Sequence, residues 1–111
     1  MAAAEPPLAQ GQVMTVFRSR RRDSAEAAYL QVAEEMESAA RASAGFVDFK
    51  SFEAEDGERV SVVTFASMET HRAWRDHPEH RAAQQRGRDS FYASYDISVG
   101  EIIGESHFPG P

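Results

Sequence analysis

The stretch that decides the fold runs from residue 46 to residue 66 and reads FVDFKSFEAEDGERVSVVTFA. Two runs rich in β-branched and aromatic residues, 46–55 and 58–66, flank the dipeptide Asp56-Gly57. This dipeptide favours a type I′ turn, in which both central residues adopt a positive φ. The stretch therefore predicts a β-hairpin of two antiparallel strands.

Upstream of the hairpin, the sequence predicts a strand followed by a helix. Residues 12–19 are rich in β-formers, and both faces of this strand are mostly apolar. Asp23 and Glu26 have the spacing of a capping box, and apolar residues then recur every three or four positions as far as Ala40. Gly45 is expected to end this amphipathic helix before the hairpin begins.

Downstream of the hairpin, the pattern predicts an interrupted helix and a last strand. Ser67 can cap a helix that carries Trp74, and the dipeptide His77-Pro78 breaks it. Proline suits the first turn of a helix, so a new helix is expected to begin at Pro78. Residues 94–104 form the last predicted strand.

The resulting order is β-α-β-β-α-β, which predicts an α+β, ferredoxin-like fold with a four-stranded antiparallel sheet. The predicted domain spans residues 12–105, between tails at 1–11 and 106–111. Helices of this arrangement cover one face of the sheet, yet three of the strands carry apolar residues on both faces. We therefore expect a homodimer in which a second copy covers the other face.

Composition excludes several classes of function. The chain has 111 residues and a formal net charge of −6, which argues against a nucleic-acid partner. It has no apolar run of membrane-spanning length and no secretory pattern at its N-terminus, so we expect no membrane partner and a cytoplasmic location. The absence of cysteine excludes disulfides, thiolate nucleophiles and thiolate-bound metals.

Four segments resemble the antibiotic biosynthesis monooxygenase (ABM) family: 17–20 (FRSR), 45–51 (GFVDFKS), 73–80 (AWRDHPEH), and 87–92 together with Tyr95. The resemblance covers residues 12–104 and implies a dimeric α+β barrel. The family includes cofactor-independent monooxygenases that act on polyketide anthrones and quinols, heme-degrading monooxygenases, and small proteins with no assigned reaction. Family resemblance alone does not decide among these activities.

The resemblance implies candidate catalytic residues on the second helical segment. The cofactor-independent enzymes use a Trp, which Trp74 matches, and a Tyr whose position is occupied by His80. Histidine can exchange protons near neutral pH, so we predict His80 or His77 as the base, with Trp74 as a further catalytic residue. This hypothesis requires no cofactor and no metal.

Two alternatives remain open. The heme-degrading branch places its axial His ten residues after the Trp, where this chain has Gln84, and an Asn on its first strand, which this chain lacks. Heme binding is therefore the weaker enzymatic alternative, and its marker would be a Soret band. The other alternative is a non-enzymatic dimeric module that binds a small hydrophobic molecule.

The predicted pocket lies between residues 74–87 and the sheet, and it suits a flat, aromatic ligand. We predict that the substrate-binding side chains are those of Phe17, Phe65, Gln84, Phe91 and Tyr95. His71 is expected on an exposed turn and receives no role. Gly87 interrupts a helix at a cost of about 1 kcal/mol relative to Ala, which indicates close packing at that position.

Overall fold

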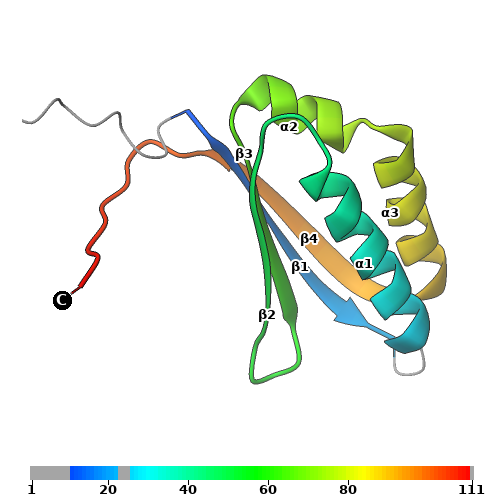
Figure 1. The fold of residues 1–111 in the computed structure, drawn as a ribbon. Coiled ribbons are helices and arrows are strands. Elements are labelled where there is room, and N and C mark those ends of the chain that lie inside the picture. Colours follow the sequence, from blue (N-terminus) through cyan, green and yellow to red (C-terminus); the bar gives the residue numbers. More distant parts are fainter. Residues whose placement is uncertain (1–10, 23–25, 111) are drawn as a thin grey trace, which may run out of the picture.

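The computed structural model describes residues 11–22 and 26–110. These residues form seven elements: β1 (Val13–Arg21), α1 (Glu26–Arg41), β2 (Phe46–Glu53), β3 (Arg59–Phe65), α2 (Met68–Arg75), α3 (Pro78–Ser90) and β4 (Tyr92–Glu101). Figure 1 shows the helices packed beside a single twisted sheet. The predicted α+β, ferredoxin-like order is confirmed, with α2 and α3 sharing the second helical region.

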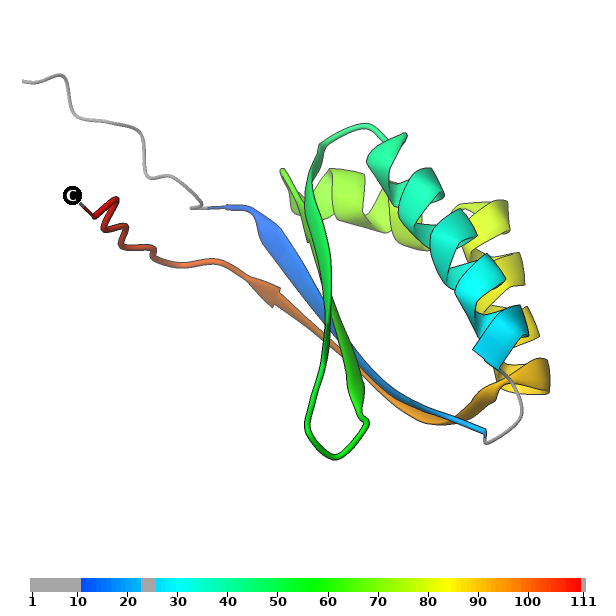
Figure 2. The same ribbon diagram turned by 60° about the horizontal axis from the view of Figure 1, so that its bottom comes forward.

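The sheet has the order β2-β3-β1-β4, and all neighbouring strands are antiparallel. The helices lie on one face of it, as Figure 2 shows. Two clusters of side chains fill the space between the layers. The first contains Tyr29, Val32, Ala83, Phe91 and Tyr92. The second contains Ala40, Val63, Phe65 and Trp74.

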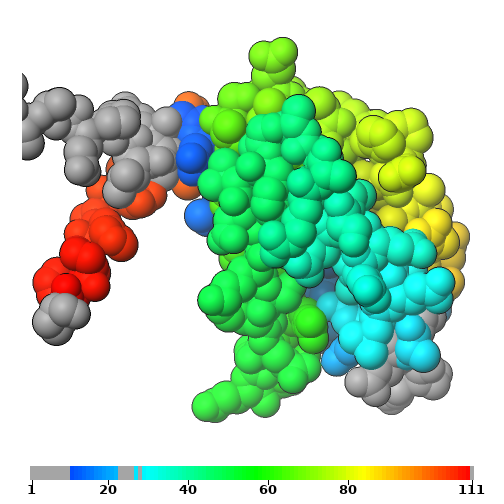
Figure 3. Space-filling model, viewed as in Figure 1, coloured from blue at the N-terminus to red at the C-terminus, as the bar shows by residue number. Residues whose placement is uncertain are grey.

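The strand pairing extends the first and last strands beyond the residues predicted for their shared end. β1 continues to Arg21 and β4 begins at Tyr92, because these two residues pair across a register shift that follows Arg20. β4 ends at Glu101, three residues earlier than predicted. The segment that follows is exposed and projects away from the body of the molecule (Figure 3).

The hairpin is present, but its predicted type I′ turn is wrong. Gly57 has a φ of 88°, whereas no other residue type among those described has a positive φ, so Asp56 does not adopt one. The Gly57 amide donates to the carbonyl of Ala54, and the Ala54 amide donates to the carbonyl of Glu58. This is the pattern of a type I turn followed by a left-handed glycine.

Local capping explains the break between α2 and α3. Ser67 forms a capping box with Thr70 at the start of α2, which confirms the predicted cap. The Nδ1 atom of His77 accepts a hydrogen bond from the Glu79 amide at 3.1 Å, and Pro78 occupies the first turn of α3. The predicted capping box at Asp23 lies outside the described residues. None of the described helices has the length and apolarity needed to cross a membrane.

The glycine at position 87 lets the end of α3 approach an aromatic ring. A Cβ atom placed on Gly87 would collide with the ring of Tyr92, reaching 2.7 Å from its Cδ2 atom. Tyr92 and neighbouring Phe91 are both buried, so neither ring has free space into which to move. Close packing, as the sequence predicted, therefore explains the glycine.

We expect Gly87→Ala to lower the free energy of unfolding by about 2 kcal/mol, because overpacking outweighs the gain of about 1 kcal/mol in helix propensity. Urea denaturation measures the effect. Gly104→Ala is the matched control, since nothing lies within 4 Å of an added Cβ there. A Gly87→Ala variant as stable as the parent would contradict the packing explanation.

The face of the sheet opposite the helices is not covered by any described element. The strand register places five apolar side chains on it: Met14, Val16, Phe52, Val60 and Val62. Phe52 is 50% exposed, and the other four are half-buried. We refer to these five residues as the open face.

Candidate functional site

A cluster of one indole and two imidazoles lies where α2 meets α3. The Trp74 ring stacks on Phe65 of β3 with centroids 5.0 Å apart, and its centroid lies 4.4 Å from that of His80 and 5.9 Å from that of His71. All three polar rings are buried. The break at His77-Pro78 turns the chain so that the first turn of α3 brings His80 back against Trp74.

The expectation that His71 lies on an exposed turn is wrong. His71 is 1% exposed, and its Nδ1 atom lies 3.4 Å from Oγ1 of Thr15 on β1. The spacing could have indicated this, because residues three apart lie on the same side of a helix and Trp74 faces the core. His71 is the functional candidate that sequence reasoning missed.

The electrostatics of the cluster favour neutral imidazoles. Burial lowers the pKa of His80 from 6.5 to about 4, and repulsion from His71, Arg81 and His77 adds to the effect. Burial also lowers the pKa of His71, with Arg75 and Arg72 contributing repulsion. The prediction that His80 titrates near neutral pH is therefore wrong, and the ring is an uncharged proton acceptor at pH 7.

This shift makes the stability of the protein depend on pH. The unfolded chain binds a proton at His80 near pH 6.5, whereas the folded chain does so near pH 4. The free energy of unfolding is therefore unaffected by this group above pH 6.5. As the pH drops from 6.5 toward 4, protonation of His80 in the unfolded chain lowers the free energy of unfolding by about 3 kcal/mol. Denaturation at pH 7 and pH 4.5 should show most of this loss in the parent and little of it in His80→Gln. An equal loss in both would mean that other groups dominate.

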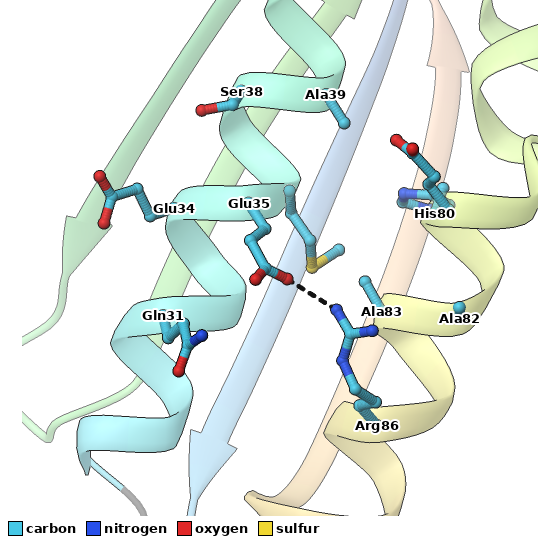
Figure 4. Close-up of a pocket in the computed structure, with 11 residues that line it drawn as sticks. Gln31, Glu34, Glu35, Ser38, Ala39, His80, Ala82, Ala83 and Arg86 are labelled. Carbon is cyan, nitrogen blue, oxygen red and sulfur yellow. Dashed lines mark hydrogen bonds and ion pairs between the residues drawn. The ribbon is translucent and has the colours of Figure 1, made fainter.

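A cleft of about 800 Å³ opens between α1 and α3 (Figure 4). It is lined by Gln31, Glu34, Glu35, Met36, Ser38, Ala39, Glu79, His80, Ala82, Ala83 and Arg86. An ion pair of 2.7 Å between Glu35 and Arg86 crosses it. His80 thus contacts both the cleft and the buried ring of Trp74.

The cleft lies between two helices, whereas the predicted pocket lay between α3 and the sheet. Of the predicted site residues, His80 alone lines this cleft. Aromatic side chains pack between α3 and the sheet instead: Phe17 contacts Tyr92 and Tyr95, with centroids 5.4 and 5.2 Å apart. The polar lining of the helical cleft was not foreseen, because it depends on how α1 and α3 face one another.

The remaining predicted residues fall into separate groups. Phe65 joins Trp74 and His80, as predicted for one site, whereas Phe17, Phe91 and Tyr95 belong to the other core cluster. The Tyr95 hydroxyl accepts a hydrogen bond from Arg88 at 2.7 Å. Gln84 is half-buried on α3, and His77 is exposed and caps that helix, so neither is one of the buried rings beside Trp74.

The donor set does not fit a heme or a metal. Within residues 11–22 and 26–110, no group of three or more His, Asp or Glu side chains is placed to hold a metal ion. The position of the axial ligand in the heme-degrading branch holds the amide of Gln84, which is a poor ligand for iron.

Comparison with known proteins identifies the family. The family model described as "Antibiotic biosynthesis monooxygenase" matches residues 12–86. The chain belongs to the ABM family. It is 33% identical over 98 residues to the uncharacterized protein YqjZ of Bacillus subtilis (strain 168), a match that spans 88% of this chain and 82% of YqjZ. The family resemblance stated from sequence is therefore confirmed.

Solved structures share the ABM fold at low sequence identity. Rv0793 from Mycobacterium tuberculosis superposes with a TM-score of 0.76 at 20% identity, over 86% of this chain and 99% of that one. SnoaB from Streptomyces nogalater, described as a cofactor-independent oxygenase, superposes with a TM-score of 0.73 at 15% identity, over 90% and 99% of the two chains. These similarities establish the fold alone.

Proposed function

We propose that this ABM protein is a cofactor-independent monooxygenase that uses molecular oxygen to oxidise a small aromatic substrate of the anthrone or quinol type. The observation that carries the proposal is the buried contact between neutral His80 and Trp74, whose ring centroids lie 4.4 Å apart. His80 also lines the cleft between α1 and α3. The arrangement supplies a proton acceptor beside a flat aromatic wall. Membership of the ABM family and the description of SnoaB support the same chemistry.

The proposed reaction needs no electrons beyond those of the substrate. The imidazole of His80 takes the proton of an acidic C–H bond, and the resulting carbanion transfers an electron to O₂. Recombination forms a C–O bond and a peroxide, which takes up a proton. Loss of the second C–H proton and cleavage of the O–O bond then give a carbonyl and one molecule of water. A CH₂ group and O₂ thus become C=O and H₂O.

The surroundings of His80 suit this chemistry. A buried imidazolium is unfavourable by itself, but it is stabilised when an anion forms beside it. The Trp74 ring stacks on the fully buried ring of Phe65, which holds the indole in place beside His80. Ile97 and Val99 share the helix-facing side of the sheet with Phe17 and Thr15, and they are 42% and 46% exposed. The edge of the sheet thus offers an apolar approach toward the cluster.

Oxygen uptake with a panel of anthrones and quinols, in the presence of a chelator, tests the proposal. For an anthrone we expect consumption of one O₂ per carbonyl formed, unaffected by the chelator. Saturable binding of compounds from the panel, without oxygen uptake on any of them, would instead support the non-enzymatic binding module. A Soret band that appears on adding hemin and disappears in His80→Ala would favour the heme alternative.

We further propose that the protein works as a homodimer built on the open face. The open face contains two half-buried residues from each central strand: Met14 and Val16 on β1, and Val60 and Val62 on β3. Together they form an apolar surface larger than isolated exposed side chains would give. A second copy of the same face is self-complementary under two-fold symmetry. Packing two such sheets face to face would produce the barrel implied by the family.

A further inference from the structure

Two nitrogen atoms on α2 are buried without a hydrogen-bond partner among the described residues: Nε1 of Trp74 and Nε2 of His71. Their side chains are 7% and 1% exposed. A buried donor without an acceptor destabilises a folded protein, and an apolar side chain would avoid that cost. Each of the two nitrogens therefore requires a hydrogen-bond partner, which is either a ligand atom or an ordered water.

The contact between Thr15 and His71 favours one tautomer of the imidazole. The contact of 3.4 Å to Nδ1 is the one hydrogen bond that the Thr15 hydroxyl makes among the described residues, and Thr15 is only 5% exposed. In a neutral imidazole one nitrogen donates and the other accepts. Donation from Thr15 to Nδ1 gives the hydroxyl proton an acceptor and leaves the imidazole proton on Nε2. The unpartnered nitrogen of His71 is then a donor.

The two donors belong to one small region. His71 and Trp74 lie three residues apart on the same side of α2, with ring centroids 5.9 Å apart, and His80 contacts Trp74 from α3. Thr15 pairs in the sheet with Val99, which is 46% exposed, so the region lies beside the apolar edge described above. Two N–H groups without an acceptor suit an oxygen atom, above all one that becomes negatively charged.

We propose that His71 Nε2–H and Trp74 Nε1–H together bind one oxygen of the substrate, a carbonyl or phenolate oxygen conjugated with the acidic C–H bond. When the proton moves from carbon to His80, the C–H electron pair forms a C=C bond and the carbonyl π electrons move onto this oxygen. The two donors stabilise the resulting enolate. This inference rests on the proposed function and narrows its substrates to hydroxyaromatic or ketonic ring systems.

The binding of 1,8-dihydroxyanthraquinone tests the oxygen site without any turnover, because the ionised phenol of this probe has its own visible absorption. We expect the parent protein to lower the apparent pKa of the bound phenol. His71→Phe should weaken binding of the ionised probe by about 10- to 100-fold. His71→Gln, which keeps an N–H donor, should retain most of the affinity, and the exposed control His107→Gln should not differ from the parent.

Nitrogen-15 NMR of the parent protein at pH 7 provides a readout that does not depend on whether a variant folds. We expect a protonated Nε2 on His71 and downfield movement of this resonance and of the Trp74 indole N–H when the probe binds. Protonation of His71 at Nδ1 instead, or equal affinity of the parent and folded His71→Phe for the ionised probe, would overturn the inference. Probe binding of the expected kind without oxygen uptake on the substrate panel would overturn the proposed function and leave the oxygen site standing.

Discussion

Replacing His80 with alanine is expected to lower the turnover of an active anthrone or quinol substrate by about 10²- to 10⁴-fold, the usual contribution of a positioned proton acceptor. The reason is geometric, because His80 is the imidazole that reaches both the cleft and the ring of Trp74. Initial rates of oxygen uptake at saturating substrate measure the effect. Trp74→Phe keeps an aromatic ring but removes the indole N–H, so it should lower kcat as well as raise KM.

Controls separate this loss from a failure to fold. His80→Gln keeps most of the side-chain volume but cannot take up the proton, so it should be as inactive as His80→Ala while remaining folded. His107→Ala removes an exposed imidazole and should have the activity of the parent. Full activity in a folded His80→Gln protein would exclude His80 as the base.

Element order could be predicted from sequence because it depends on local patterns. The alternating strand residues, the Ser67 cap and the helix restart at Pro78 are all read from neighbouring positions, and the structure confirms them. The turn at Asp56-Gly57 was predicted in the wrong class, since its geometry depends on where the strand pairing ends. β2 stops at Glu53 and β3 starts at Arg59, which leaves a longer loop than a two-residue turn.

The candidate site was only partly predictable, because its properties arise from packing between distant segments. Trp74 and His80 were identified from a local motif, whereas the contact between His71 and Thr15 joins residues 56 positions apart. The low pKa of His80 has the same origin: burial against Trp74 is its largest cause, and burial is set by the fold. A sequence motif can identify a catalytic candidate, but it does not reveal the surroundings that control the pKa of that residue.

Placing a charge in the middle of the open face is expected to convert a dimer into a monomer. Val62 lies on β3, opposite Val16 of β1 in the register, near the centre of the apolar surface. In a two-fold interface, Val62→Asp would bury two carboxylates without partners, at a cost of several kcal/mol in total, and raise the dimer dissociation constant by at least about 100-fold. Light scattering should give about twice 12.3 kDa for the parent and 12.3 kDa for the variant.

Two further variants make this prediction specific to the open face. Leu30→Asp introduces the same charge at a side chain that is 50% exposed on α1, on the helical side of the molecule, and should leave the dimer intact. Phe52→Lys changes a side chain of the open face that is also 50% exposed, so it should weaken the dimer with little loss of fold stability. A parent protein that scatters as a single chain at micromolar concentration would contradict the argument, since the apolar open face would then have no second copy to cover it.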